Sequence, residues 1–182
     1  MAAQFAHLAS QNGPLEYHLA IDVYPNSAEL HNSFGTALQA NGRLDLAAGE
    51  FSRAIELNST FADAHNNLGL ALLATGRRDQ VDQAEREFQE AISINPHFAD
   101  AENNLGTLYG QQGSDARAEK WFRMAIESDP KSTKAIVNLA ATLASESRFA
   151  DADAILQKAL EIDPANKEAG ELKGLLKAHG KQ

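Results

Sequence analysis

The chain has 182 residues, of which 25 are acidic and 16 basic, and its formal net charge is −9. Alanine occurs 33 times whereas valine, isoleucine and threonine together occur 17 times, a balance that favours helices over strands. The acidic charge, with no run of Lys or Arg, argues against nucleic acid as a partner. No apolar stretch is long enough to cross a bilayer, and the lack of cysteine excludes disulfides and thiolate chemistry. We expect an all-α, soluble protein of the cytoplasm or the periplasm, with no membrane insertion.

The first 27 residues are predicted to hold one short helix that begins at Pro14, because proline is favoured in the first turn of a helix. Leu15, Leu19 and Val23 recur in this helix at a spacing that places them on one side. The helix stops before Pro25, which is the first member of a ladder of residues that continues through the chain.

Four copies of one pattern follow, at residues 28–61, 62–98, 99–132 and 133–166, here called repeats 1 to 4. The string FADAHNNLG at Phe61 returns as FADAENNLG at Phe98, 37 residues later, whereas the other intervals are 34 residues. Repeat 2 therefore holds a three-residue insertion near residues 77–83, which lengthens a turn or extends the helix after it. In repeat 3 the helical pattern breaks at Gly113 and stops at Pro130, so that each repeat reads as two helices.

A small residue follows the recurrent Leu or Phe in the first helix of every repeat. Two antiparallel helices approach closely only where one of them presents almost no side chain, and glycine in a helix costs about 1 kcal/mol relative to alanine. We therefore expect close helix contacts at these positions, which are Gly35, Gly69, Gly106 and Ala140.

The repeats resemble the tetratricopeptide repeat, whose pattern is W-x₂-L-G-x₂-Y, then A-x₃-F, then P. Repeat 3 supplies Leu105-Gly106, Tyr109, Ala118, Phe122 and Pro130. The resemblance implies a right-handed α-solenoid of antiparallel helix pairs with a concave groove. It also implies that residues 1–27 form a degenerate or partial repeat and that residues 167–182 form a capping helix. In that helix Leu172, Leu175 and Leu176 are expected to cover repeat 4, with Lys173 and Lys177 in water.

Signatures of catalysis are missing from the sequence, which has no phosphate-binding loop, no nucleophile elbow and no metalloprotease motif. His31 and His65 stand at the same position of successive repeats, where the family often has Trp. Ligands one repeat apart do not converge on one ion, so packing is preferred over metal binding. We predict no enzymatic activity, no metal and no cofactor.

Asparagines recur on the first helix of the repeats, which lines the inner face in this family. In long members of the family, an asparagine ladder holds the backbone of an extended peptide, since a primary amide both donates and accepts hydrogen bonds. The alternative is that these amides only bond neighbouring helices. The residues predicted to bind a peptide are Asn32, Asn66, Asn67, Leu70, Asn103, Asn104, Thr107 and Asn138.

The predicted function is a non-enzymatic scaffold whose groove binds an extended or helical segment of another protein. One alternative is self-assembly into a homo-oligomer through the imperfect N-terminal unit. Another is an accessory tetratricopeptide domain of a larger enzyme.

Overall fold

The computed structural model describes residues 14–179, and within this range it contains ten α-helices, one short 3₁₀ helix and no strand. The helices are α2 (Pro14–Val23), α3 (Ala28–Ala40), α4 (Leu44–Leu57), α5 (Ala62–Ala74), η1 (Arg78–Gln80), α6 (Val81–Ile94), α7 (Ala99–Gln111), α8 (Asp115–Ser128), α9 (Thr133–Ser145), α10 (Phe149–Ile162) and α11 (Lys167–His179). The chain divides into two compact parts, Met1–Pro96 and His97–Gln182.

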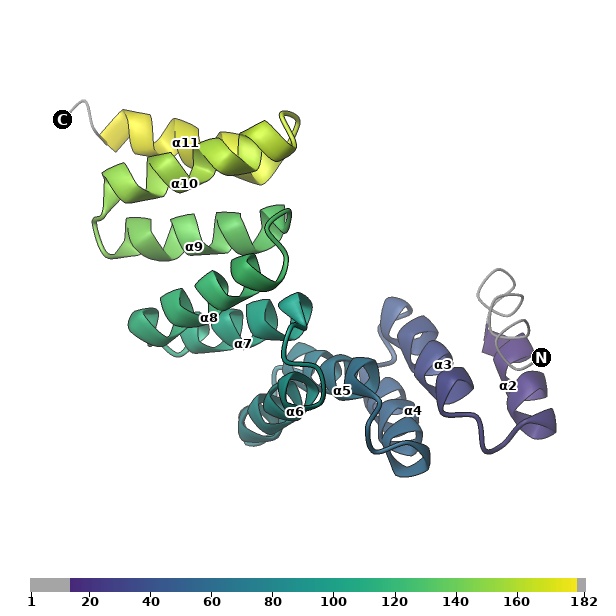
Figure 1. Cartoon of the computed structure of the whole chain (residues 1–182). Coiled ribbons are helices and arrows are strands. Elements are labelled where there is room, and N and C mark those ends of the chain that lie inside the picture. The colour runs from purple at the N-terminus through teal and green to yellow at the C-terminus, as the bar shows by residue number, and fades with distance from the viewer. Residues whose placement is uncertain (1–13, 180–182) are drawn as a thin grey trace. The chain divides into compact units, whose positions relative to one another are not determined.

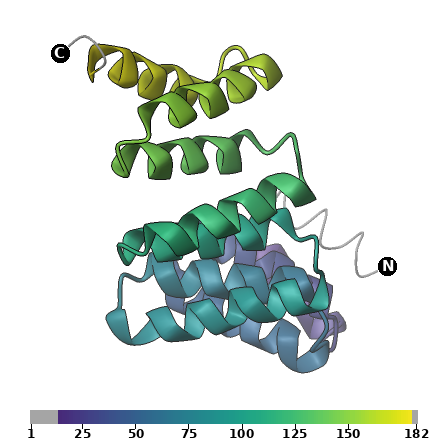
Figure 2. The ribbon, with the colours of Figure 1, turned by 60° about the vertical axis from the view of Figure 1, so that its left-hand side comes forward.

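Within each part, consecutive helices pack against one another as stacked hairpins. In the N-terminal part α3 packs on α4 and α5 on α6, and α4 also contacts α5, while α2 packs on α3 (Figure 1). In the C-terminal part α7 pairs with α8 and α9 with α10, and α11 covers α10 (Figure 2). Each part thus has the local architecture of an all-α solenoid, in which a helix touches mainly its neighbours in sequence.

The turn between the two helices of a repeat has the same geometry each time. In repeat 1 the backbone N–H of Arg43 donates to the carbonyl of Leu38 (2.9 Å), which closes the end of α3. The turn needs a left-handed residue, and Gly42, Gly76 and Gly113 supply it with φ of 71°, 70° and 71°. Repeat 4 places Ser147 at this position with φ of 64°, so a residue with a side chain adopts the left-handed conformation there.

The close helix approach expected at the small residues is present. A β-carbon added to Gly106 would lie 2.7 Å from Cε1 of Phe122, and Gly35 and Gly69 face Phe51 and Phe88 in the same way at 2.6 Å. These phenylalanine rings are almost completely buried. In repeat 4 the corresponding pair is Ala140 and Leu156, both fully buried, so a smaller ring-free side chain accompanies the larger small residue.

The insertion in repeat 2 forms the separate 3₁₀ turn η1, and it does not lengthen the following helix. Helix α6 has 14 residues, as α4 has. Arg77, just before the turn, forms an ion pair of 3.3 Å with Asp45 of repeat 1. Because both side chains are exposed, the pair contributes little to stability.

Helix α11 corrects two expectations about the C-terminal end. Leu176 is buried and Leu172 half-buried, but Leu175 is 64% exposed, so the prediction that it covers repeat 4 is wrong. Lys173 stands where repeat 4 has the recurrent Leu139, and it therefore points at α10 rather than into water. Its amine donates to Gln157 and lies 3.8 Å from a carboxylate oxygen of Asp153.

Candidate functional site

The asparagines of the first helices are brought together across neighbouring repeats. In the N-terminal part the side-chain amide of Asn67 on α5 donates to the side-chain oxygen of Asn32 on α3 at 3.0 Å. In the C-terminal part Asn138 on α9 donates to Asn103 on α7 at 2.9 Å. The bonding partner that the sequence analysis gave as an alternative, the neighbouring helix, is thus present for these two pairs.

The exposure of the predicted site residues differs along the ladder. Asn66, Asn103 and Asn104 are almost completely buried, so their amides act from beneath the surface. Half-buried side chains that remain within reach of solvent are Asn32, Asn67, Leu70, Thr107 and Asn138.

The threonines on these helices bond their own backbone. The hydroxyl of Thr107 donates to the carbonyl of Asn103 at 2.9 Å, and that of Thr36 donates to the carbonyl of Asn32 at 3.0 Å. A hydroxyl used in this way still has lone pairs that accept from a ligand. The amides and hydroxyls form a neutral, mixed polar and apolar surface on α3 and α5, and a similar one on α7 and α9.

The two histidines at the family's Trp position are each held by a glutamate of the second helix. Nδ1 of His31 lies 2.7 Å from Glu50, and Nδ1 of His65 lies 2.7 Å from Glu87. The other ring nitrogen of each histidine faces a backbone carbonyl, that of Pro25 at 3.1 Å and that of Ser59 at 3.3 Å. Since both partners are acceptors, a ring that donates from both nitrogens satisfies them.

The hydrogen bond with Glu87 raises the pKa of His65 above its usual 6.5; burial opposes this increase, and the charges of Glu87 and Glu90 add to it. The expectation that these histidines serve packing rather than metal binding did not include their carboxylate partners. The signal was nonetheless present, because His31 and His65 recur together with Glu50 and Glu87 in the same two repeats.

The corresponding pair in repeat 3 is reversed in polarity, with Glu102 on the first helix and Trp121 on the second. Glu102 is 1% exposed, and its Oε2 has no hydrogen-bond partner in the described part of the chain. Burial raises the pKa of Glu102 above its usual 4.5, while Ser128 and His97 partly offset that rise. In repeat 4 both positions are isoleucine, Ile136 and Ile155.

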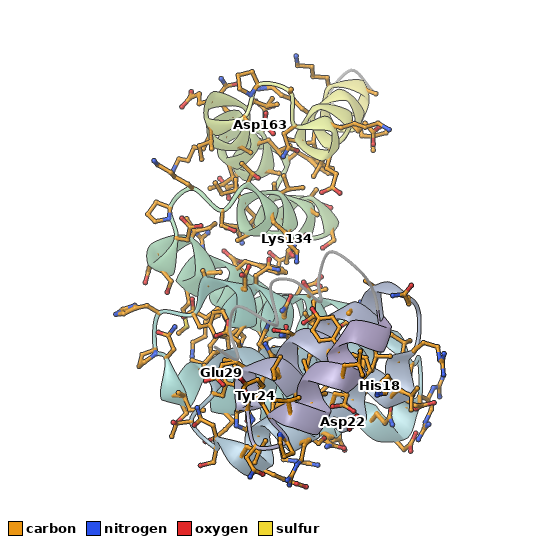
Figure 3. The ribbon with its side chains drawn as sticks, turned by 90° about the vertical axis from the view of Figure 1, so that its right-hand side faces the viewer. His18, Asp22, Tyr24, Glu29, Lys134 and Asp163 are labelled. Carbon is orange, nitrogen blue, oxygen red and sulfur yellow. The ribbon has the colours of Figure 1, made fainter. Side chains whose placement is uncertain are left out.

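The searches for other kinds of site gave plain results over the same residues. Across residues 14–179, no group of three or more His, Asp or Glu side chains is arranged to hold a metal ion. No helix in this range combines the length and the apolar character that crossing a bilayer demands. A shallow hollow of about 350 Å³ lies beside Lys134 and Asp163 (Figure 3), and charged and polar groups line it.

Solved structures share the fold of this chain at low sequence identity. A structure described as pilF of Pseudomonas aeruginosa has a TM-score of 0.84 and 18% identity, with 99% of this chain and 84% of that chain covered. MamA has a TM-score of 0.72 and 24% identity, covering 83% and 86%. YrrB, described as a TPR protein with an unusual peptide-binding site, has a TM-score of 0.68 and 22% identity, covering 91% and 84%. No protein among the curated sequences matches this chain.

Family models agree with these structures over most of the chain. Residues 35–76 match a model described as TPR repeat, and residues 77–133 and 133–166 match two models described as Tetratricopeptide repeat. The matched segments adjoin one another and contain the Gly–Phe contacts and the asparagine pairs described above. The chain belongs to the tetratricopeptide repeat family.

Proposed function

We propose that this chain is a non-enzymatic protein-interaction module, and that the asparagine-bearing faces of its first helices bind an extended peptide segment of another protein. The observation that carries the proposal is the pairing of amides between neighbouring repeats. It fixes Asn67 and Asn138 in defined orientations at half-buried positions.

A paired asparagine keeps the capacity to bind a peptide group. A primary amide has two N–H groups and a carbonyl oxygen, and the bond from Asn67 to Asn32 uses one N–H of Asn67. The second N–H and the carbonyl oxygen match the acceptor and the donor of a peptide backbone. Side chains fixed before binding lose less conformational entropy when the ligand arrives.

The chemistry of the face indicates a ligand recognised mainly through its backbone. Thr36, Leu70 and Thr107 add hydroxyl and apolar contacts, and the first helices of repeats 1 to 3 contain no Lys or Arg. Such a surface does not select for an acidic segment. We expect micromolar affinity, about −8 kcal/mol, because modest apolar burial and a few amide contacts supply it. The peptide-binding site in the description of YrrB supports this class of ligand.

The test uses a peptide selected from a random library against the full chain and titrated by calorimetry. Replacing Asn67 and Asn138 with Ala, singly and together, should weaken binding about tenfold for each lost pair of amide contacts. Asn58 supplies a control, since its side chain accepts from Thr60 in an exposed turn, and Asn58→Ala should leave affinity unchanged. Because Asn67→Ala also removes an inter-repeat bond, urea titrations must show that each variant remains folded. Unchanged affinity in the folded double variant would refute the proposal.

A second candidate, self-association, is favoured by exposed apolar residues on the two terminal helices. Leu19 and Val23 on α2 are 60% and 65% exposed, and Leu175 on α11 is 64% exposed. Exposed leucine and valine clusters often mark interfaces. Light scattering from 5 to 500 µM would show a rising mass if copies associate, and a constant monomer mass would exclude this candidate.

A further inference from the structure

A repeat-by-repeat comparison separates one arginine from its counterparts. The residue directly before the second helix is Arg43 in repeat 1, Gln80 in repeat 2, Ser114 in repeat 3 and Arg148 in repeat 4. Repeats 1 and 4 thus place a guanidinium group at the same point of the hairpin, and its surroundings can be compared directly.

In repeat 4 three carboxylates surround the guanidinium group of Arg148. Glu119 of the preceding second helix lies at 2.7 Å, Glu146 of the turn at 3.0 Å and Asp151 of the following turn at 3.1 Å. These contacts neutralise the arginine and fix its position.

In repeat 1 every one of these carboxylates is replaced. In the register that aligns Phe51 with Leu156, the residues corresponding to Glu119, Glu146 and Asp151 are Pro14, Asn41 and Leu46. Among residues 14–179, Arg43 has no ion-pair partner. The guanidinium group is exposed, so an anion is able to reach it.

The same replacements open a cavity beside Arg43. Helix α2 has 10 residues whereas α4, α6, α8 and α10 have 14 each, and all end at the same register, so α2 lacks the first turn of a second helix. A hollow of about 430 Å³ lies there, between α2 and the α3–α4 hairpin. Its described lining includes His18, Phe34, Leu38, Asn41, Arg43 and Leu46.

The corresponding place in other repeats is occupied by their own side chains. In repeat 3 the guanidinium group of Arg117, at the position of Leu46, covers the ring of Tyr109 at 5.4 Å. In repeat 4 the Arg148 cluster lies there. The repeat 1 hollow therefore results from particular substitutions and is not a general property of the hairpin.

The lining has three chemically different parts. Phe34, Leu38 and Leu46 provide an apolar wall, and Leu46 is 49% exposed although the corresponding residues elsewhere are Gln83, Arg117 and Asp151. The ring of His18 on α2 (Figure 3) meets Phe34 edge-on at 4.8 Å and extends this wall.

The polar part of the lining contains one cation, one amide and one carboxylate. Asn41 donates to the carbonyl of Ala37 at 2.8 Å, and its own side-chain oxygen is an acceptor that lines the hollow. The carboxylate of Glu50 also lines it, but the 2.7 Å contact with His31 engages that carboxylate.

We propose that this hollow binds the carboxyl-terminal residue of a polypeptide whose last side chain is apolar. The apolar side chain packs on Phe34, Leu38 and Leu46, the terminal carboxylate pairs with Arg43, and the N–H of the last residue donates to Asn41. A guanidinium group matches a carboxylate with two parallel hydrogen bonds. The volume suits one leucine or phenylalanine residue and part of the residue before it, within the usual range of ligand pockets.

The test follows the side-chain signals of Arg43 and Asn41 by NMR while acetyl-Gly-Gly-Leu is added to the full chain. The free acid should shift both signals, and its C-terminal amide should bind at least tenfold more weakly because it lacks the charge. Arg43→Gln should reduce affinity for the acid about tenfold and leave the weak binding of the amide unchanged. Leu46→Asp, which restores the acid of repeat 4, should also weaken binding because it pairs with Arg43.

A matched control comes from the same helix. Arg53 is exposed and pairs with Glu56 at 2.8 Å, so Arg53→Gln removes one positive charge without altering the hollow, and affinity should not change. Equal affinity for acid and amide, an unaffected Arg43→Gln variant or shifts confined to other residues would overturn the proposal. Octanoate supplies the same anion without a peptide N–H, and equal binding of octanoate would overturn the assignment to a polypeptide end. Circular dichroism confirms that the variants are folded.

Discussion

The contact between the small residue and the aromatic ring predicts opposite effects for two glycines of one helix. At Gly106 a β-carbon would lie 2.7 Å from Cε1 and 2.8 Å from Cδ1 of Phe122, well inside van der Waals contact. At Gly110, one turn further along α7, the nearest atom would be Cβ of Ala118 at 3.8 Å. Both substitutions to alanine gain about 1 kcal/mol of helix propensity. Only Gly106→Ala meets overpacking, which costs about 1–3 kcal/mol in a well-packed core.

We therefore expect Gly110→Ala to raise the free energy of unfolding by about 0.5–1 kcal/mol. Gly106→Ala should be neutral to destabilising by about 2 kcal/mol, the difference between the two terms. Repeat 4 indicates how the cost is relieved, since it combines Ala140 with Leu156 in place of glycine with phenylalanine.

Urea unfolding followed by circular dichroism measures both effects. A double-mutant cycle of Gly106→Ala with Phe122→Leu should give a favourable coupling of about 0.5–3 kcal/mol, as expected for residues in direct contact. If Gly106→Ala stabilises the protein as much as Gly110→Ala does, or the coupling is zero, the contact is not limiting and the reasoning fails.

Three further predictions concern titration and backbone strain. The raised pKa of His65 means that its bond to Glu87 stabilises the fold fully below pH 6.5 and that this contribution is lost as the pH rises through the folded-state value; the stability difference between the parent and Glu87→Gln, measured by urea at pH 6 and pH 9, should shrink at the higher pH. The raised pKa of Glu102 means that the fold loses stability as the pH rises above 4.5; Glu102→Gln should raise the melting temperature at pH 8 and leave it nearly unchanged at pH 4, and an equal effect at both would contradict this. Ser147→Gly should stabilise by about 1 kcal/mol because the left-handed conformation is strained for a residue with a side chain; Gly113→Ser should destabilise by a similar amount in the same thermal assay.

Local periodicity was enough to predict the helix pairs and the close contacts at the glycines. These features repeat, so each residue has counterparts that constrain its interpretation, and Gly106 with Phe122 follows from the spacing of the pattern alone. The exposure of Leu175 was not predictable from period alone, because α11 carries Lys173 at the recurrent leucine position and lacks a following helix in the described residues. A hydrophobic pattern states which residues are apolar but not which of two faces has a neighbour.

The sites divide in the same way. The asparagine ladder was visible as a recurring residue type, and its hydrogen bonds between repeats required the distance between α3 and α5. The cavity beside Arg43 gave no motif, since it results from residues that are missing relative to repeat 4. Such a site emerges only when each position of one repeat is compared with the geometry of another.

The paired positions that hold His31 with Glu50, His65 with Glu87 and Glu102 with Trp121 limit how segments of this chain can be exchanged. Each first-helix residue is matched to its own second-helix partner, so a consensus sequence averaged position by position would combine members of different pairs. A glutamate placed opposite a glutamate would leave two acids in one buried site, where like charges repel. Shuffling of these modules, in the laboratory or during duplication of the gene segment, is therefore expected to succeed when whole hairpins move together and to fail when single helices are recombined.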